Sequence, residues 1–143
     1  MKLFFLMFFL VASCSVIDDF NRKEFTYEGK EREHKLVLHI PRGYKEEKKM
    51  LDTAGGKEQF YYYSNGALIY FTNKVSWPTE NDSIIRQMKP VSTDGESFVY
   101  RGMDKDGLYW KEIRHESFRF GYSYVPKSNI DRFEKAVNTV RMR

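Results

Sequence analysis

Alternation of apolar and polar residues predicts a series of β-strands in the middle of the chain. Residues 34–40 alternate in this way and end at Pro41, which cannot donate a backbone hydrogen bond to a neighbouring strand. The runs 58–63 and 67–72 are rich in aromatic and β-branched residues, which suit a half-buried sheet surface. They flank Ser64-Asn65-Gly66, where Asn-Gly supplies the positive φ angles of a type I′ turn, so the two runs are predicted to form a hairpin.

The last third of the chain predicts a meander of three strands, at residues 96–101, 108–114 and 117–125, with turns at 104–107 and 115–116. Aromatic residues occupy alternate positions of the last segment, namely Phe118, Phe120, Tyr122 and Tyr124. Alternate side chains of a strand point to the same side. The pattern is therefore typical of an antiparallel sheet that is covered on one face.

A helix is predicted to follow Pro126 and to supply this cover. Ser128 and Asp131 have the spacing of a capping box. The residues after them form one apolar stripe at helical spacing, made of Ile130, Phe133, Ala136, Val137 and Val140. The predicted fold class is α+β, an antiparallel sheet of about five to seven strands with a C-terminal helix packed on one face.

Two segments carry weaker patterns. Between Trp77-Pro78 and Lys89-Pro90, the sequence predicts a short helix over residues 81–88, with Asn81 as its cap. The mixed-sign run 45–49 predicts a solvated loop or helix face, because neither side of it is apolar.

The first residues have the order of a secretory signal. Lys2 precedes an unbroken apolar run at residues 3–12, and small residues follow. The run is too short to span a bilayer, which takes about 20 apolar residues. Val11-Ala12-Ser13-Cys14 resembles the lipobox of bacterial lipoproteins, in which the signal is cut before a cysteine that becomes acylated. The alternative is an ordinary secretory signal with a chance cysteine.

The resemblance implies that residues 1–13 are a signal peptide and that Cys14 carries the lipid. Acyl chains such as palmitate would then anchor the protein, since several chains bind a membrane stably where one is marginal. Ser15 replaces the aspartate that commonly retains lipoproteins at the inner membrane, which favours the outer membrane. Asp18-Asp19 resemble the surface-export signals of Bacteroidota lipoproteins, or form an acidic tether, so the side of the membrane stays open.

Residues 14–31 are polar and predict a lipid-bearing tether, with a first strand near 24–27, and residues 32–143 predict a single domain. The element order, together with Ile40-Pro41-x-Gly43-Tyr44, is similar to that of PsbP/DcrB-like envelope proteins. That similarity implies a compact α+β sandwich. It implies no activity, because one fold can support many functions.

Composition narrows the class of protein further. A chain of 143 residues is the usual size of one domain, and 41% hydrophobic residues supply a core. The single cysteine excludes an intramolecular disulfide and a multi-cysteine zinc site. A net charge of +4 is too small to indicate nucleic-acid binding, and no glycine-rich nucleotide motif occurs, so no cofactor is predicted.

Candidate catalytic and metal-binding residues are few. His34 and His39 have an odd separation, which places them on opposite sides of a strand. Asp104-x-Asp106-Gly107 begins like a calcium loop but lacks the later ligands, so a turn is the better interpretation. Glu112 with Glu116, or Asp104 with Asp106, could form a carboxylate pair. Such pairs occur by chance in a chain with 20 acidic residues, so a small hydrolase is the least favoured hypothesis.

The excess of aromatic residues suggests a binding surface. If residues 114 and 117 are opposite across the 115–116 turn, Trp110 faces Gly121 and Glu112 faces Arg119, on the side of the sheet away from the helix. Trp110, Gly121, Glu112 and Arg119, with Trp77, are the predicted recognition surface. The alternative is that residues 73–95 cover this face and that Trp77 packs on Trp110.

The leading hypothesis is a lipid-anchored, non-enzymatic envelope protein that binds another envelope protein or an outer-membrane complex. The alternative is a surface glycan-binding lipoprotein in which Trp77, Trp110 and tyrosines stack on sugars.

Overall fold

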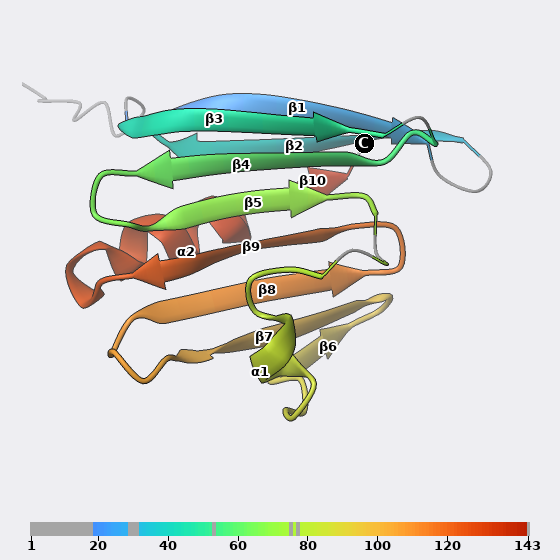
Figure 1. The fold of residues 1–143 in the computed structure, drawn as a ribbon. Helices are drawn as coiled ribbons and strands as arrows, with labels where there is room; N and C mark the ends of the chain where they lie inside the picture. The colour runs from blue at the N-terminus through green and yellow to red at the C-terminus, as the bar shows by residue number, and fades with distance from the viewer. Residues whose placement is uncertain (1–18, 29–31, 53, 75, 77, 143) are drawn as a thin grey trace, which may run out of the picture.

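The computed structural model describes residues 19–28, 32–52, 54–74, 76 and 78–142. The predicted signal peptide, Cys14 and Trp77 lie outside these residues. The fold is α+β, as the sequence predicts. Its larger sheet is antiparallel, with seven strands in the order β3-β4-β5-β9-β8-β7-β6 (Figure 1). A smaller sheet has the order β1-β2-β10.

The strands of the larger sheet are β3 (Tyr44–Leu51), β4 (Lys57–Tyr63), β5 (Leu68–Thr72), β6 (Ser92–Asp94), β7 (Ser97–Met103), β8 (Tyr109–His115) and β9 (Arg119–Val125). The smaller sheet contains β1 (Phe20–Glu28), β2 (Glu33–Pro41) and β10 (Arg141–Met142). The helices are α1 (Asp82–Ile85), a 3-10 turn η1 (Lys127–Asn129) and α2 (Ile130–Asn138).

The main core lies on one side of the larger sheet, which we call the helix face. The smaller sheet and α2 pack there, and α2 lies behind β5 and β9 in Figure 1. The alternation in β9 places Phe120 and Tyr122 on this face, where Tyr122 meets Phe133 of α2 with ring centroids 5.8 Å apart. The predicted apolar stripe of the helix therefore buries Phe133, Ala136 and Val137.

The opposite side of the sheet, which we call the loop face, carries α1 and the segment leading to it (Figure 1). Tyr70, Trp110 and Ile85 are buried but do not belong to the main core cluster. Tyr70 lies under the segment that leads to α1, since Asn81 Nδ2 donates to its hydroxyl. Residues 79–85 therefore lie over this face, as in the alternative, whereas residues 92–94 form strand β6 of the sheet itself.

The folded part of the chain begins earlier than the sequence predicts. Phe20–Glu28 pair with β2 along their whole length, and Phe25 and Tyr27 enter the main core. Residues 20–28 are therefore a strand of the domain and not part of a tether that continues to residue 31. The apolar residues of this strand are too few for its alternation to stand out among its charged residues.

The charged run 45–49 is also a strand rather than a loop or helix face. It lies within β3, an edge strand of the larger sheet, and pairs with β4. Most of its side chains are exposed. Charged residues are a common feature of edge strands because they discourage pairing with other molecules.

The hairpin between β4 and β5 forms as predicted, but its turn is of another type. Gly66 has a φ of +84°, whereas Tyr124 is the only described residue other than glycine with positive φ, so Asn65 lacks the conformation of a type I′ turn. The Gly66 N–H donates to the Tyr63 carbonyl at 3.1 Å, and the Tyr63 N–H donates to the Ala67 carbonyl at 2.9 Å. This is a three-residue loop, with the left-handed glycine at its third position.

The capping box predicted at Ser128 does not form. Residue 128 lies in the 3-10 turn η1, and Asn129 stands at the cap of α2 without a side-chain hydrogen bond. The turn brings the chain out of β9, so α2 begins at Ile130.

Candidate functional site

The turn between β8 and β9 lies one residue further along the chain than predicted. His115 pairs with Phe118, since its N–H donates to the Phe118 carbonyl at 2.9 Å and the two rings stack 4.7 Å apart. Glu112 therefore lies opposite Gly121, and Arg114 lies opposite Arg119. Each residue of β8 therefore faces a residue of β9 two positions beyond the predicted one. Because alternate residues of a strand share a side, Glu112 still lies on the loop face.

Three residues of the predicted recognition surface are buried. Trp110 is only 3% exposed and Glu112 is 0% exposed, and Gly121 is buried as well. The indole of Trp110 lies over Gly102 of β7 rather than over Gly121, and a Cβ at Gly102 would come within 2.9 Å of the ring. Glu112 lies under the segment that leads to α1, because Thr79 of that segment contacts its carboxylate. Trp110 instead lines the hollow between α2 and β7.

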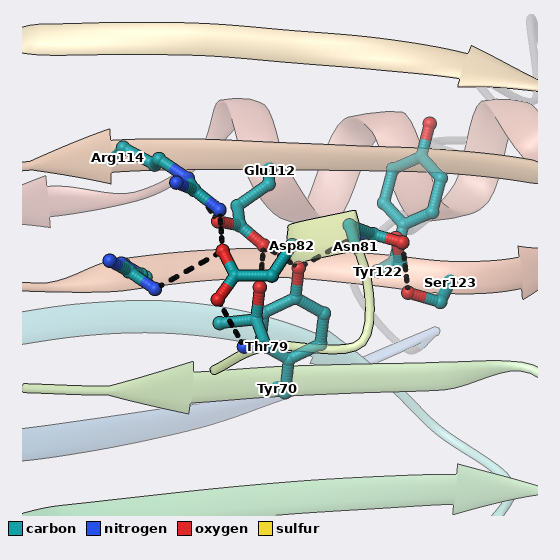
Figure 2. A network of polar contacts seen from close by, with 9 residues as sticks. Tyr70, Thr79, Asn81, Asp82, Glu112, Arg114, Tyr122 and Ser123 are labelled. Atoms are coloured by element: carbon teal, nitrogen blue, oxygen red, sulfur yellow. Dashed lines mark hydrogen bonds and ion pairs between the residues drawn. The ribbon is translucent and has the colours of Figure 1, made fainter. Parts of the chain in front are cut away.

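Glu112 is the centre of a buried polar network on the loop face (Figure 2). Its Oε2 accepts hydrogen bonds from the hydroxyls of Tyr70 and Thr79, the latter at 2.6 Å. Its Oε1 accepts from Arg114 Nε at 2.6 Å. Both carboxylate oxygens are thus used inside the protein.

Asn81 and Asp82 connect α1 to the same network. Asn81 Nδ2 donates to Tyr70 Oη at 3.0 Å, and Asn81 Oδ1 accepts from Ser123 Oγ at 3.0 Å. Asp82 pairs with Arg114, and its Oδ1 also lies 3.4 Å from Arg119 Nη1. Figure 2 shows that these side chains join the segment at residues 79–82 to strands β5, β8 and β9.

The electrostatics favour a neutral Tyr70 and a charged Arg114. Burial raises the pKa of Tyr70 well above its ordinary value, and the adjacent Glu112 carboxylate raises it further. Burial works to lower the pKa of Arg114, but Glu112 and Asp82 outweigh it, so the pKa of Arg114 is raised. Tyr70 stays neutral and Arg114 stays charged, which suits a network that holds α1 on the sheet.

Gly121 has a structural role in this network. A Cβ at this position would come within 2.3 Å of the Lys111 carbonyl and 2.7 Å of Tyr70 Oη. The glycine therefore leaves room for Tyr70 to reach Glu112, rather than for a ligand.

The other predicted chemical residues do not assemble into a site. Glu112 is buried while Glu116 is exposed, so the two carboxylates do not face a common cleft. Asp104 Oδ1 accepts the backbone N–H groups of Asp106 and Leu108, each at 2.9 Å, as expected of a turn. Within the described part of the chain, no three His, Cys, Asp or Glu side chains gather as metal ligands.

A solvent-open groove lies on the helix face, between α2 and the strands β6, β7 and β8. We call it the α2 groove. Its main hollow has a volume of about 560 Å³ and an apolar lining that includes Val91, Met103, Tyr109 and Ile130. A second hollow of about 280 Å³ adjoins it and shares Val91 and Arg101. Ile130, Glu134 and Asn138 are spaced four residues apart, so one face of α2 forms the wall.

Most charged groups of the α2 groove are paired. Lys111 Nζ donates to Glu134 Oε2 at 2.7 Å and to Asn138 Oδ1 at 3.2 Å, and Tyr122 Oη donates to Glu134 Oε1 at 2.6 Å. Burial acts to raise the pKa of Glu134, but the hydrogen bonds from Lys111 and Tyr122 outweigh this effect. The pKa of Glu134 is therefore lowered.

Arg101 is the exception among these charges. It is exposed, lines both hollows and acts on Glu134 through its charge. The guanidinium of Arg101 forms no hydrogen bond or ion pair with any residue that the structure describes. The groove therefore offers an apolar surface with one available cation.

Sequence reasoning identified Glu112 and Arg119 but missed their partners and the groove. The contacts join residues far apart in the chain: Tyr70 lies 42 residues from Glu112, and Thr79 lies 33 residues from it. Asn81 lies 41 residues from Tyr122, whose carbonyl it contacts. No local pattern marks such contacts. Arg101 alternates with apolar residues in its strand, and only the packing of α2 reveals what it faces.

No protein-family model, curated protein or solved structure matches the chain. Among the described residues, no helix is both long and apolar enough to cross a membrane.

Proposed function

We propose that this protein is a lipid-anchored envelope protein that binds another envelope protein without catalysis, and that the α2 groove holds a segment of that partner. The lipobox at residues 11–14 supports the anchor, and Ser15 favours the outer membrane. The observation that carries the binding proposal is the combination of an open, apolar groove with the unpaired cation of Arg101.

The size and lining of the groove fit an elongated, largely apolar occupant. Binding sites commonly have volumes of about 300–1,000 Å³ and an apolar lining with a few polar groups that fix orientation. Exposed apolar residues gather at the open side, where Val91 is 50% and Met103 is 59% exposed. Large apolar patches on a protein surface are typical of interaction sites. The cation of Arg101 favours a segment that carries a carboxylate.

Site-specific photo-cross-linking in the producing cells tests this proposal. A photoreactive amino acid at Met103 should give a protein adduct, identified by mass spectrometry. The same residue at Leu51, which is 73% exposed on the far edge of the sheet, should not. Arg101→Glu should abolish the Met103 adduct, whereas Lys45→Glu, with the same change of charge on β3, should retain it. Equal adducts at both positions, or a Met103 adduct with lipid alone, would contradict the proposal.

A glycan-binding function has one supporting observation, on the loop face. The rings of Phe60 and Tyr62 stack with centroids 6.1 Å apart and are half-buried. A cavity of about 310 Å³ adjoins them, lined by Phe60, Thr79 and Glu80 among others. Aromatic rings beside polar groups suit a sugar. Binding on a glycan array that is lost in Tyr62→Ala but kept in Arg101→Glu would favour this function.

A further inference from the structure

The outer edge of β7 is only partly paired. Strand β6 has three residues and pairs with β7 only from Ser97 to Val99. Strand β7 continues to Met103, and no described strand pairs with its outer edge beyond Val99. The segment from Tyr100 to Met103 is therefore an open sheet edge beside the α2 groove.

The sequence explains why the chain does not close this edge itself. The Val91 N–H donates to the Val99 carbonyl at 2.8 Å, which is the last backbone contact between the two segments. The preceding residue, Pro90, has no N–H and cannot extend the ladder. The segment before β6 therefore leaves the sheet at Pro90.

The direction of the free backbone groups follows from two hydrogen bonds. The Val99 carbonyl points outward to Val91, and the Asp104 N–H points inward to the Leu108 carbonyl at 2.9 Å. Successive residues of a strand direct their backbone groups to opposite edges. Arg101 and Met103 therefore present their N–H and C=O groups outward, whereas Tyr100 and Gly102 direct theirs to β8.

The surroundings of this edge are apolar. Four of the seven large hydrophobic residues that are exposed among those described lie in residues 88–103, namely Met88, Val91, Phe98 and Met103. Exposed edges usually carry charges or prolines that prevent pairing. β3, at the other end of the sheet, carries the charged residues 45–49, followed by the exposed Met50 and Leu51. Between Val99 and Met103 the β7 edge carries one charge, that of Arg101, so it is less protected against pairing.

We propose that an extended segment of the partner adds to the β7 edge as a further strand. This inference rests on the proposed function and specifies how the partner is held. The backbone groups of Arg101 and Met103 supply two donors and two acceptors, which an extended chain satisfies in register. Alternate side chains of the added strand enter the α2 groove, and a carboxylate among them pairs with the Arg101 guanidinium.

Hydrogen exchange of the backbone amides, measured on the full chain in lipid nanodiscs, tests whether the partner segment adds as a strand. A phage-displayed library of random peptides is selected on this protein, and the enriched peptides are synthesised. Nuclear magnetic resonance then measures amide exchange with and without peptide. The amides of Arg101 and Met103 should exchange more slowly when peptide is bound. Those of Tyr100 and Gly102 are internal controls, because they are paired with β8 in both states.

Two variants of Met103 separate the contribution of its backbone N–H to peptide binding from that of its side chain. Met103→Pro removes an outward N–H that the protein does not use itself, and Met103→Ala removes only the side chain. Met103→Pro should bind peptide about tenfold more weakly than Met103→Ala, as expected for the loss of one hydrogen bond. Equal melting temperatures for the two variants would show that both are folded.

The outcomes distinguish the binding mode from the function. Peptides that bind without slowing the exchange of Arg101 and Met103, and that bind equally to both Met103 variants, overturn strand addition but leave the proposed function intact. A library that yields no binding peptide overturns the proposed function, as does a groove that binds sodium oleate but no peptide.

Discussion

Replacing Glu112 should reveal how strongly the buried network holds α1 on the sheet. Glu112→Ala removes a fully buried carboxylate and leaves the Tyr70 and Thr79 hydroxyls and Arg114 Nε without their acceptor. Removing one member of a buried charged pair costs about 3–5 kcal/mol. Arg114 keeps its contact with Asp82, so its charge is not left alone, and the loss should lie near the lower end of this range.

Glu112→Gln should cost less, about 1–2 kcal/mol. Its single carbonyl oxygen can accept from Arg114 Nε, while its amide donates to the hydroxyls of Tyr70 and Thr79. Hydroxyl groups can reverse their hydrogen-bond direction, whereas a guanidinium cannot. The substitution therefore preserves the contacts and loses mainly the charge.

Urea titration followed by circular dichroism measures both free energies of unfolding. Glu33→Ala, an exposed residue of β2 with the same change of charge, is the matched control and should stay within about 0.5 kcal/mol of wild type. A Glu112→Ala loss below about 1 kcal/mol would refute the reasoning. Equal losses for the Ala and Gln variants would show that charge, rather than lost contacts, dominates.

Three other predictions follow from the sequence and the fold. Cys14→Ser should move the protein out of the membrane fraction and change its mass, and an unchanged fraction with an unchanged mass would contradict lipidation. Gly66→Val should cost about 1–3 kcal/mol, because the residue has a φ of +84°, and a wild-type melting temperature would exclude this strain. Glu134 has a lowered pKa in the folded state, so it stabilises the protein above its unfolded pKa and this stability is lost as the pH falls through the folded value. Glu134→Gln should therefore flatten the loss of melting temperature in acid, and an unchanged slope would contradict the role of Lys111 and Tyr122.

The regular alternation of the sequence was sufficient to predict the fold class. Strand β9 and the terminal helix each have one apolar side, and burial selects that side. The hairpin of β4 and β5 was predicted from its aromatic and β-branched residues and its Asn-Gly turn. Strands β1 and β3 were harder to predict. The charged residues of β3 face solvent at a sheet edge, so no alternation marks them. Only their pairing in three dimensions defines them as strands.

The candidate site shows a sharper limit. The sequence placed Trp110 and Glu112 on the side away from the helix, because alternation fixes the side even when the register is uncertain. It could not decide whether a loop covers Glu112. That depends on Asn81 reaching Tyr70 and on Thr79 reaching Glu112, contacts between residues far apart in the chain. The α2 groove likewise depends on where α2 packs, which local periodicity does not determine.

The central claim is that the β7 edge and the α2 groove are occupied by a partner in the cell envelope. Hydrogen–deuterium exchange of the peptide that covers residues 97–103 tests it directly, when measured by mass spectrometry in native membranes and in the purified protein. We expect slower exchange in membranes than in the purified protein, with no difference in residues 44–51 of the opposite edge. Equal exchange of residues 97–103 in the two preparations would contradict the claim.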